Sequence, residues 1–172
     1  FTFMVWEKLY NACKNKNIKL DLSQGVLIHG GGWKNLIKNK ISNNIFKQNL
    51  LKQFKLHEAH DYYGMIEQIG SIFMECEYGH LHIPDFSDVL IRDTKTLKTV
   101  PNGHKGLIQV LSILPHSYPG HNLLTEDLGA IIGEDDCNCG RYGKYIKIFG
   151  RLPKAELRGC SDTYAFENSG TS

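Results

Sequence analysis

The stretch from residue 25 to residue 63 constrains the fold of this chain more strongly than any other part. A short apolar run over residues 25–29 leads into a run of glycines, and apolar residues then recur every three to five positions over residues 35–54. This pattern predicts a buried strand, a loop and an amphipathic helix of about five turns. A further strand is predicted over residues 57–63. Strand, helix and strand with short connections form a βαβ unit, usually with a parallel sheet.

The remainder of the chain has a different pattern of apolar residues. A helical pattern occupies residues 4–16, whereas from Ser71 onward short β-type runs alternate with turn clusters. These runs lie at residues 81–83, 89–91, 107–111 and 145–149. The sequence therefore predicts an α/β protein in three parts: an α/β portion over residues 1–75, a β-rich subdomain over residues 76–149, and a hinge with a short mobile tail over residues 150–172.

Composition excludes several classes of protein. With 172 residues, 41% apolar and 22% charged, the chain can bury a core and is typical of soluble globular proteins. A net charge of +2 argues neither for nucleic acid nor for an anionic membrane, and we expect no nucleic-acid partner. Six lysines and no acidic residue lie between Leu22 and His57, and we interpret them as a solvated helix face rather than a polyanion site. No apolar run approaches the roughly 18 residues that a membrane span needs.

The cysteines indicate a reducing compartment and a metal site. Five cysteines without regular spacing fit the cytoplasm better than a secreted disulfide scaffold. Cys76, His82, Cys137 and Cys139 provide three thiolates and one imidazole, a standard tetrahedral set for one structural Zn²⁺ per chain. His80 is an alternative to His82 as the imidazole ligand. The competing interpretation is a set of reduced, half-buried cysteines without a metal.

Two segments of the first part have residues that suit a nucleotide, and each also has a plainer interpretation. Gly30, Gly31 and Gly32 would let a phosphate or a planar ligand approach the backbone, or form an ordinary turn. The segment from Tyr63 ends a strand with the Glu67 carboxylate, which suits Mg²⁺, although a structural glycine turn explains it as well.

Two later segments have the same ambiguity. The acidic stretch Thr125–Gly129, treated as a turn, offers carboxylates that could accept two ribose hydroxyls in a bidentate fashion, but isolated acidic turns are common. Arg151 follows a predicted strand and could set its planar guanidinium near a phosphate or a ribose.

The order and spacing of these segments resemble the adenylate-forming superfamily, and within it the bacterial acyl-protein synthetases. These are the fatty-acid-activating subunits of luminescence-type fatty acid reductase systems. The matching motifs are His29-Gly30-Gly31-Gly32-Trp33-Lys34, Tyr63-Gly64-Met65-Ile66-Glu67-Gln68, Ser117-Tyr118-Pro119-Gly120-His121, Thr125-Glu126-Asp127-Leu128-Gly129 and the stretch from Gly150 to Asp162.

The resemblance implies a role for each motif. The glycine loop and Tyr63-Gly64-Met65 would flank the adenine of ATP, and Glu67 would serve Mg²⁺. Asp127 would hold the ribose, and Arg151 would mark the hinge to the mobile tail. The implied reaction converts a long-chain fatty acid and ATP into acyl-AMP, then moves the acyl group to a cysteine near the C-terminus, for delivery to a reductase partner.

Carried over by position, the acyl acceptor is Cys160. Its neighbours Arg158 and Gly159 would favour the thiolate and leave room for a ligand, whereas the plainer interpretation is a surface cysteine without a role. A thiolate is the strongest common side-chain nucleophile near neutral pH. His29 and His121 are candidates for the general base.

Two departures from the superfamily suggest a C-terminal half. The Ser/Thr/Gly-rich phosphate loop is absent, and the chain starts with Phe1 rather than methionine. The lysine-bearing C-terminal domain of longer relatives is absent too, as suits the acyl-protein synthetases. We therefore expect a fragment of a longer enzyme with little or no adenylation activity alone. Two alternatives stay open: an acyl- or aryl-CoA ligase relative that acylates CoA or a carrier protein, and a non-catalytic, zinc-stabilised binding subunit.

Overall fold

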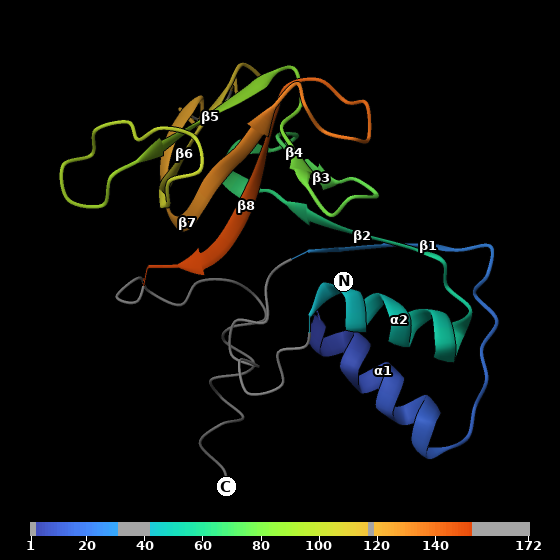
Figure 1. The fold of residues 1–172 in the computed structure, drawn as a ribbon. Coiled ribbons are helices and arrows are strands. Elements are labelled where there is room, and N and C mark those ends of the chain that lie inside the picture. The colour runs from blue at the N-terminus through green and yellow to red at the C-terminus, as the bar shows by residue number, and fades with distance from the viewer. Residues whose placement is uncertain (1–2, 31–41, 117–118, 153–172) are drawn as a thin grey trace, which may run out of the picture. The chain divides into compact units, whose positions relative to one another are not determined.

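The structure is a computed structural model that describes residues 3–30, 42–116 and 119–152 (Figure 1). It is a mixed α/β protein, as predicted, and divides into two compact units between Asp61 and Tyr62. The predicted boundary near residue 75 is a different division and stays a prediction. Among the described residues, no helix is long and apolar enough to cross a membrane.

The first unit contains two helices and two neighbouring strands. They are α1 (Phe3–Asn15), β1 (Val26–Gly30), α2 (Asn43–Phe54) and most of β2 (Glu58–Tyr63), in agreement with the predicted elements. One apolar core joins them: Trp6, Cys13, Leu27, Phe46, Leu50, Phe54, Leu56 and Ala59. The Phe54 side chain is fully buried, and its ring meets the Trp6 ring edge to face at 5.9 Å.

Helix α2 begins and ends at recognisable capping residues. The Ser42 hydroxyl accepts the Ile45 N–H at 3.3 Å, which satisfies one unpaired donor of the first turn. At the other end Lys55 adopts a left-handed conformation with φ 55°, and its N–H caps the last carbonyls. The predicted helical residues 35–41 lie outside the described part of the chain.

Strand β1 differs from its prediction in burial. The sequence predicts a buried strand, yet Val26 and Ile28 are 57% and 51% exposed, whereas Leu27 and His29 are buried. Successive side chains of a strand point to opposite faces, so only one face of β1 contributes to the core. The prediction from the continuous apolar run was therefore wrong about Val26 and Ile28, which lie on the exposed face of this strand.

The second unit is an antiparallel sheet. It contains the short helix η2 (Ile66–Gln68) and the strands β3 (Phe73–Glu75), β4 (Leu81–His82), β5 (Ser87–Arg92), β6 (Gly106–Ser112), β7 (Asn122–Glu134) and β8 (Lys144–Arg151). The end of β2 pairs with β3, and the order continues β4-β8-β7-β6-β5. All four predicted β-type runs are strands here.

The core of the second unit is formed by alternate residues of these strands. Phe73, Val89, Ile108 and Val110 are at most 1% exposed and lie at its centre. In β5 and β6 the side chains that alternate with these core residues are mixed, and include Asp88, Arg92 and Gln109 together with three leucines. Strands β3 and β7 were not predicted, and the stretch Thr125–Gly129, expected to be an acidic turn, lies inside β7.

Candidate nucleotide site and metal cluster

Three predicted nucleotide-site residues lie together in the second unit. Tyr63 ends β2, Asp127 lies in β7 and Arg151 ends β8, where it pairs with Asp127 in the strand register. The Tyr63 hydroxyl donates to Asp127 Oδ2 at 2.8 Å. The Arg151 Nε lies 3.6 Å from Asp127 Oδ1. Each oxygen of the Asp127 carboxylate therefore faces a donor group.

The Thr125 hydroxyl makes two hydrogen bonds that fix the backbone of β7 beside Asp127. It donates to the Ile108 carbonyl at 2.8 Å and accepts the Asp127 N–H at 3.1 Å. The register of β7 against β8 shifts between Leu128 and Gly129, so the strand is irregular beside the carboxylate. The spacing of Thr125 and Asp127 thus has a structural reason: the hydroxyl fixes the backbone that carries the carboxylate.

Tyr63 is kept neutral in this position. Burial, reinforced by the negative charge of Asp127, raises the pKa of the Tyr63 phenol well above its usual value. The phenol therefore stays protonated and remains a donor at any physiological pH. Its ring also packs against Phe73, with ring centroids 5.7 Å apart. The side chains of Asp127 and Arg151 are 20% and 32% exposed, so both are partly accessible to solvent.

The residues that follow Tyr63 form a short exposed turn. Gly64 and Glu67 are exposed, and Met65 packs partly against the core of the second unit. The turn is anchored by Gln68, whose amide nitrogen donates to the carbonyls of Val110 and Gly120 at 3.1 and 2.6 Å. The motif that begins at Tyr63 includes Gln68, but the sequence assigns no role to it, because the role of a glutamine depends on its hydrogen-bond partners.

The other predicted nucleotide and acyl residues are Gly30, Gly31, Gly32 and Cys160. Gly30 ends β1 in the first unit, whereas Gly31, Gly32 and Cys160 lie outside the described residues. Both candidates for the general base are described. His29 is buried, with Nδ1 3.5 Å from Asp61 Oδ1, and His121 is exposed. Their assignment stays a prediction.

The four predicted metal ligands come together in the second unit. One potential ligand atom from each of Cys76, His82, Cys137 and Cys139 lies within 4.8 Å of all the others. The Cys76 and Cys137 sulfurs are 4.0 Å apart, and the Cys139 sulfur is 3.3 Å from His82 Nε2. Zinc–sulfur bonds of 2.3 Å in a tetrahedron place two sulfurs about 3.8 Å apart, so these spacings fit a zinc ion.

Two tight turns place the sulfurs. The N–H of Cys76 donates to the His80 carbonyl at 2.9 Å, and Gly140 donates to the Cys137 carbonyl at 3.0 Å. Gly140 has a φ of 77°, a conformation that favours glycine. These turns close the β3–β4 hairpin and the connection between β7 and β8, so a metal would join two hairpins that are far apart in sequence.

The pKa values of the cluster are shifted in both directions. Burial raises the pKa of the Cys139 thiol. Hydrogen bonds from the Arg141 N–H and with the neighbouring thiols lower this pKa by more, so it lies below its ordinary value. Burial raises the pKa of Cys137 and lowers that of His82. His82 is thus favoured as the neutral imidazole that ligates metals.

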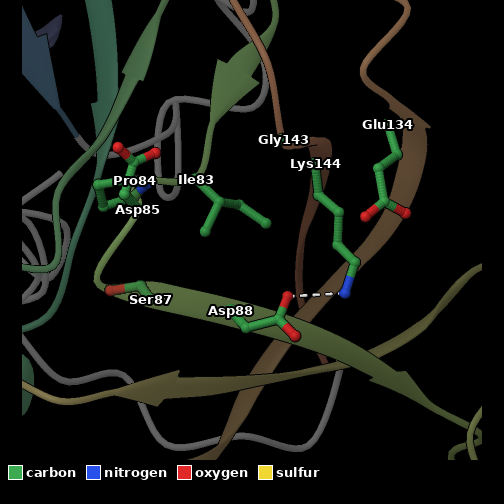
Figure 2. Close-up of a pocket in the computed structure, with 8 residues that line it drawn as sticks. All are labelled: Ile83, Pro84, Asp85, Ser87, Asp88, Glu134, Gly143 and Lys144. Carbon is green, nitrogen blue, oxygen red and sulfur yellow. Dashed lines mark hydrogen bonds and ion pairs between the residues drawn. The ribbon is translucent and has the colours of Figure 1, made fainter.

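A pocket elsewhere in the second unit contains none of the predicted site residues. Three of the residues that line it are acidic, and Lys144 Nζ lies 2.7 Å from Asp88 Oδ1 (Figure 2). The lining residues are Ile83, Pro84, Asp85, Ser87, Asp88, Glu134, Gly143 and Lys144. The pocket is small and polar, so it does not fit a long acyl chain.

The fold of this chain matches a part of the fold of solved adenylate-forming enzymes. The chain superposes on an open conformation of 2-hydroxyisobutyryl-CoA ligase in complex with 2-HIB-AMP and CoA, with a TM-score of 0.66 and 19% identity, over 92% of this chain and 37% of that one. The luciferase-like enzyme from the nonluminescent mealworm Zophobas morio gives a TM-score of 0.57 at 19% identity, over 91% and 37%.

The family follows from the sequence comparison. A family model described as acyl-protein synthetase, LuxE, matches residues 1–167, and the chain belongs to this family. It is 29% identical over 154 residues to the long-chain-fatty-acid–luciferin-component ligase of Aliivibrio fischeri and 28% identical over 151 residues to that of Vibrio harveyi. The matches cover 86% and 84% of this chain but 39% of each relative's length.

Proposed function

We propose that this chain takes part in the ATP-dependent activation of a long-chain fatty acid as acyl-AMP and in transfer of the acyl group to Cys160. Family membership and the names of the two relatives, both long-chain fatty acid ligases, support the substrate class. The observation that carries the proposal is the Asp127 carboxylate held between Tyr63 and Arg151. We infer a cytoplasmic protein, since the four described cysteines are all free thiols.

Different described residues would bind different parts of the nucleotide. Asp127 would accept hydrogen bonds from the ribose hydroxyls, and Tyr63 with Gly64 and Met65 would flank the adenine. Arg151 lies close enough to Asp127 to reach the ribose or a phosphate. The exposed Glu67 carboxylate on η2 is a hard oxygen ligand of the kind that Mg²⁺ prefers. Bound Mg²⁺ would supply positive charge to the phosphates.

The reaction has two displacements. A carboxylate oxygen of the fatty acid attacks the α-phosphorus of ATP, and pyrophosphate leaves with the electron pair of the broken bond. The Cys160 thiolate then attacks the acyl carbon: a carbon–sulfur bond forms and the bond to the AMP oxygen breaks. The thioester retains the activation, so a reductase partner could use it directly.

Binding of a stable acyl-AMP mimic tests the role of Asp127. We expect the long-chain acyl-sulfamoyl adenosine to bind to the wild-type chain in a calorimeter, and Asp127→Ala to weaken binding by about 10-fold or more, because hydrogen bonds to a charged group contribute about 1.5–3 kcal/mol. The 2′,3′-dideoxy mimic should bind equally to both proteins. Equal affinity of Asp127→Ala for the mimic with intact ribose would contradict the assignment.

We also propose that Cys76, His82, Cys137 and Cys139 bind one structural zinc ion. The spacings of the four ligand atoms support it. Four protein ligands leave no open position, which is typical of structural rather than catalytic zinc. Metal analysis of protein purified without chelator should find one zinc per chain, and less in Cys137→Ser. Wild-type protein without zinc would refute the proposal.

A further inference from the structure

His80 contacts the metal cluster without belonging to its four ligands. His80 lies between β3 and β4, and its Nδ1 is 3.3 Å from the sulfur of Cys137, which lies in the β7–β8 connection. A metal-bound cysteine is a thiolate and has no proton to donate. In the metal-loaded protein His80 must therefore be the donor of this hydrogen bond, with its hydrogen on Nδ1.

Tyr145 packs against both imidazoles of the hairpin. Its ring is stacked on His80, with centroids 4.5 Å apart and planes 20° from parallel. It also meets His82 at 5.4 Å and 35°. The β4–β8 register pairs Tyr145 with His82, so the backbone brings the two side chains together. One aromatic ring thus limits the movement of two imidazoles.

The orientation of His82 depends on this packing. Its Nδ1 is buried and has no hydrogen-bond partner in the part of the chain that the structure describes. A ligating histidine usually has its second ring nitrogen hydrogen-bonded, which holds the ring in place. Here the ring of Tyr145 supplies that restraint instead.

Tyr145 is itself fixed at its far end. Its hydroxyl donates to Asp136 Oδ1 at 3.0 Å, one residue before the first cysteine of the C-x-C pair. Gly133 makes room for this contact, because a Cβ there would lie 2.3 Å from the Tyr145 hydroxyl oxygen and 2.4 Å from Asp136 Oδ1. The contact therefore links the tyrosine to the strand and turn that carry Cys137 and Cys139.

From this arrangement we propose an outer shell for the metal site, built from His80, Tyr145 and Asp136. His80 donates its Nδ1–H to the Cys137 thiolate, and Tyr145, anchored by Asp136, orients the His80 and His82 rings. The proposal rests on the metal site proposed above. It makes His80 and Tyr145 positioning residues and leaves His82 as the imidazole ligand. Outer-shell partners of this kind typically change metal affinity by about 10- to 100-fold.

Cobalt(II) as the metal probe distinguishes the two histidines. Tetrahedral cobalt has intense visible bands that weaken or shift when a ligand is lost, and its ultraviolet charge-transfer band reports thiolate ligation. We expect one Co²⁺ per wild-type chain with a tetrahedral spectrum. His80→Ala should keep that spectrum but bind Co²⁺ about 10- to 100-fold more weakly in competition with a chelator. His82→Ala should lose the tetrahedral spectrum.

Two conservative variants separate the outer shell from a general loss of folding. In His80→Asn the side-chain amide can donate from the place of Nδ1–H, so it should restore most of the lost affinity. Tyr145→Phe keeps the stacked ring and loses only the bond to Asp136, so it should weaken binding by about 10-fold, the lower end of the range. Far-ultraviolet circular dichroism of each variant checks that the sheet is intact.

Each remaining outcome overturns a definite part of the proposal. If His80→Ala loses the tetrahedral spectrum and His82→Ala keeps it, His80 is the ligand. If His80→Ala binds Co²⁺ as tightly as wild type, the hydrogen bond to Cys137 has no role. If the wild-type chain binds no Co²⁺, the metal site fails and its outer shell with it.

Discussion

The contact between Tyr63 and Asp127 leads to a quantitative prediction about stability. Tyr63→Phe removes only the hydroxyl that donates to Asp127 Oδ2 at 2.8 Å, and leaves the ring packed on Phe73. Asp127→Ala removes the acceptor. If the two groups stabilise each other, the double variant should lose less stability than the two single variants together.

The expected size follows from the environment of the pair. Hydrogen bonds to charged groups contribute about 1.5–3 kcal/mol. The Asp127 side chain is 20% exposed, so water partly replaces the lost partner, and we expect a coupling free energy near the lower end, about 1.5 kcal/mol. The separate contact of Asp127 with Arg151 cancels in the cycle, since both Asp127 variants lack it.

Urea denaturation of the four proteins measures the coupling. Tyr142→Phe is the matched control, because Tyr142 is 82% exposed and its hydroxyl should change the free energy of unfolding by less than about 0.5 kcal/mol. A coupling of less than about 0.5 kcal/mol would show that the hydroxyl and the carboxylate do not stabilise each other, and would refute the reasoning.

Two further predictions concern stability and pH. Gly106→Ala should destabilise the protein by about 1–3 kcal/mol in urea, because the new Cβ would lie 2.3 Å from the Arg92 carbonyl oxygen; an unchanged midpoint would contradict this close approach. Hydrogen bonds from Lys55 and Ser23 lower the pKa of the exposed Asp21 from 3.8 to about 2. Since the folded-state pKa is the lower one, this stabilisation is present above pH 3.8 and is lost as the pH falls towards 2. Lys55→Met should raise the Asp21 pKa measured by NMR, and an unchanged value would show that the ion pair does not form in solution.

The periodic elements of the chain were predictable, whereas strand β7 was not. A helical pattern over residues 4–16 predicts α1, and apolar β-type runs over residues 107–111 and 145–149 predict β6 and β8. The predicted apolar side of α1 is not the buried one, since Val5 and Leu9 are exposed whereas Trp6 and Cys13 are buried. In β7 the polar residues 125–127 occupy the part near the candidate nucleotide site, and the register against β8 shifts twice. These features break the alternation on which a strand prediction depends.

Some residues of the candidate sites were likewise predictable from the sequence, and others were not. Unusual residue types identified Cys76 and the C-x-C pair from sequence, and the structure brings them together with His82. Tyr145 and its partner Asp136 carry no such signal, since tyrosine and aspartate are common and their role depends on the β4–β8 register. The ribose-binding role predicted for Asp127 depended on the family resemblance. Its hydrogen bond with Tyr63 could not be predicted from the sequence, because it depends on how the strands are arranged.

Transfer of an acyl group to Cys160 is the central claim, and intact mass spectrometry tests it directly. The wild-type chain and Cys160→Ser would each be incubated with a long-chain acyl-adenylate, which bypasses the adenylation step. The account predicts one acyl adduct on the wild type, removed by neutral hydroxylamine as a thioester is, and none on Cys160→Ser. An adduct of equal amount on Cys160→Ser, or no adduct on a wild-type chain that binds the adenylate, would contradict it.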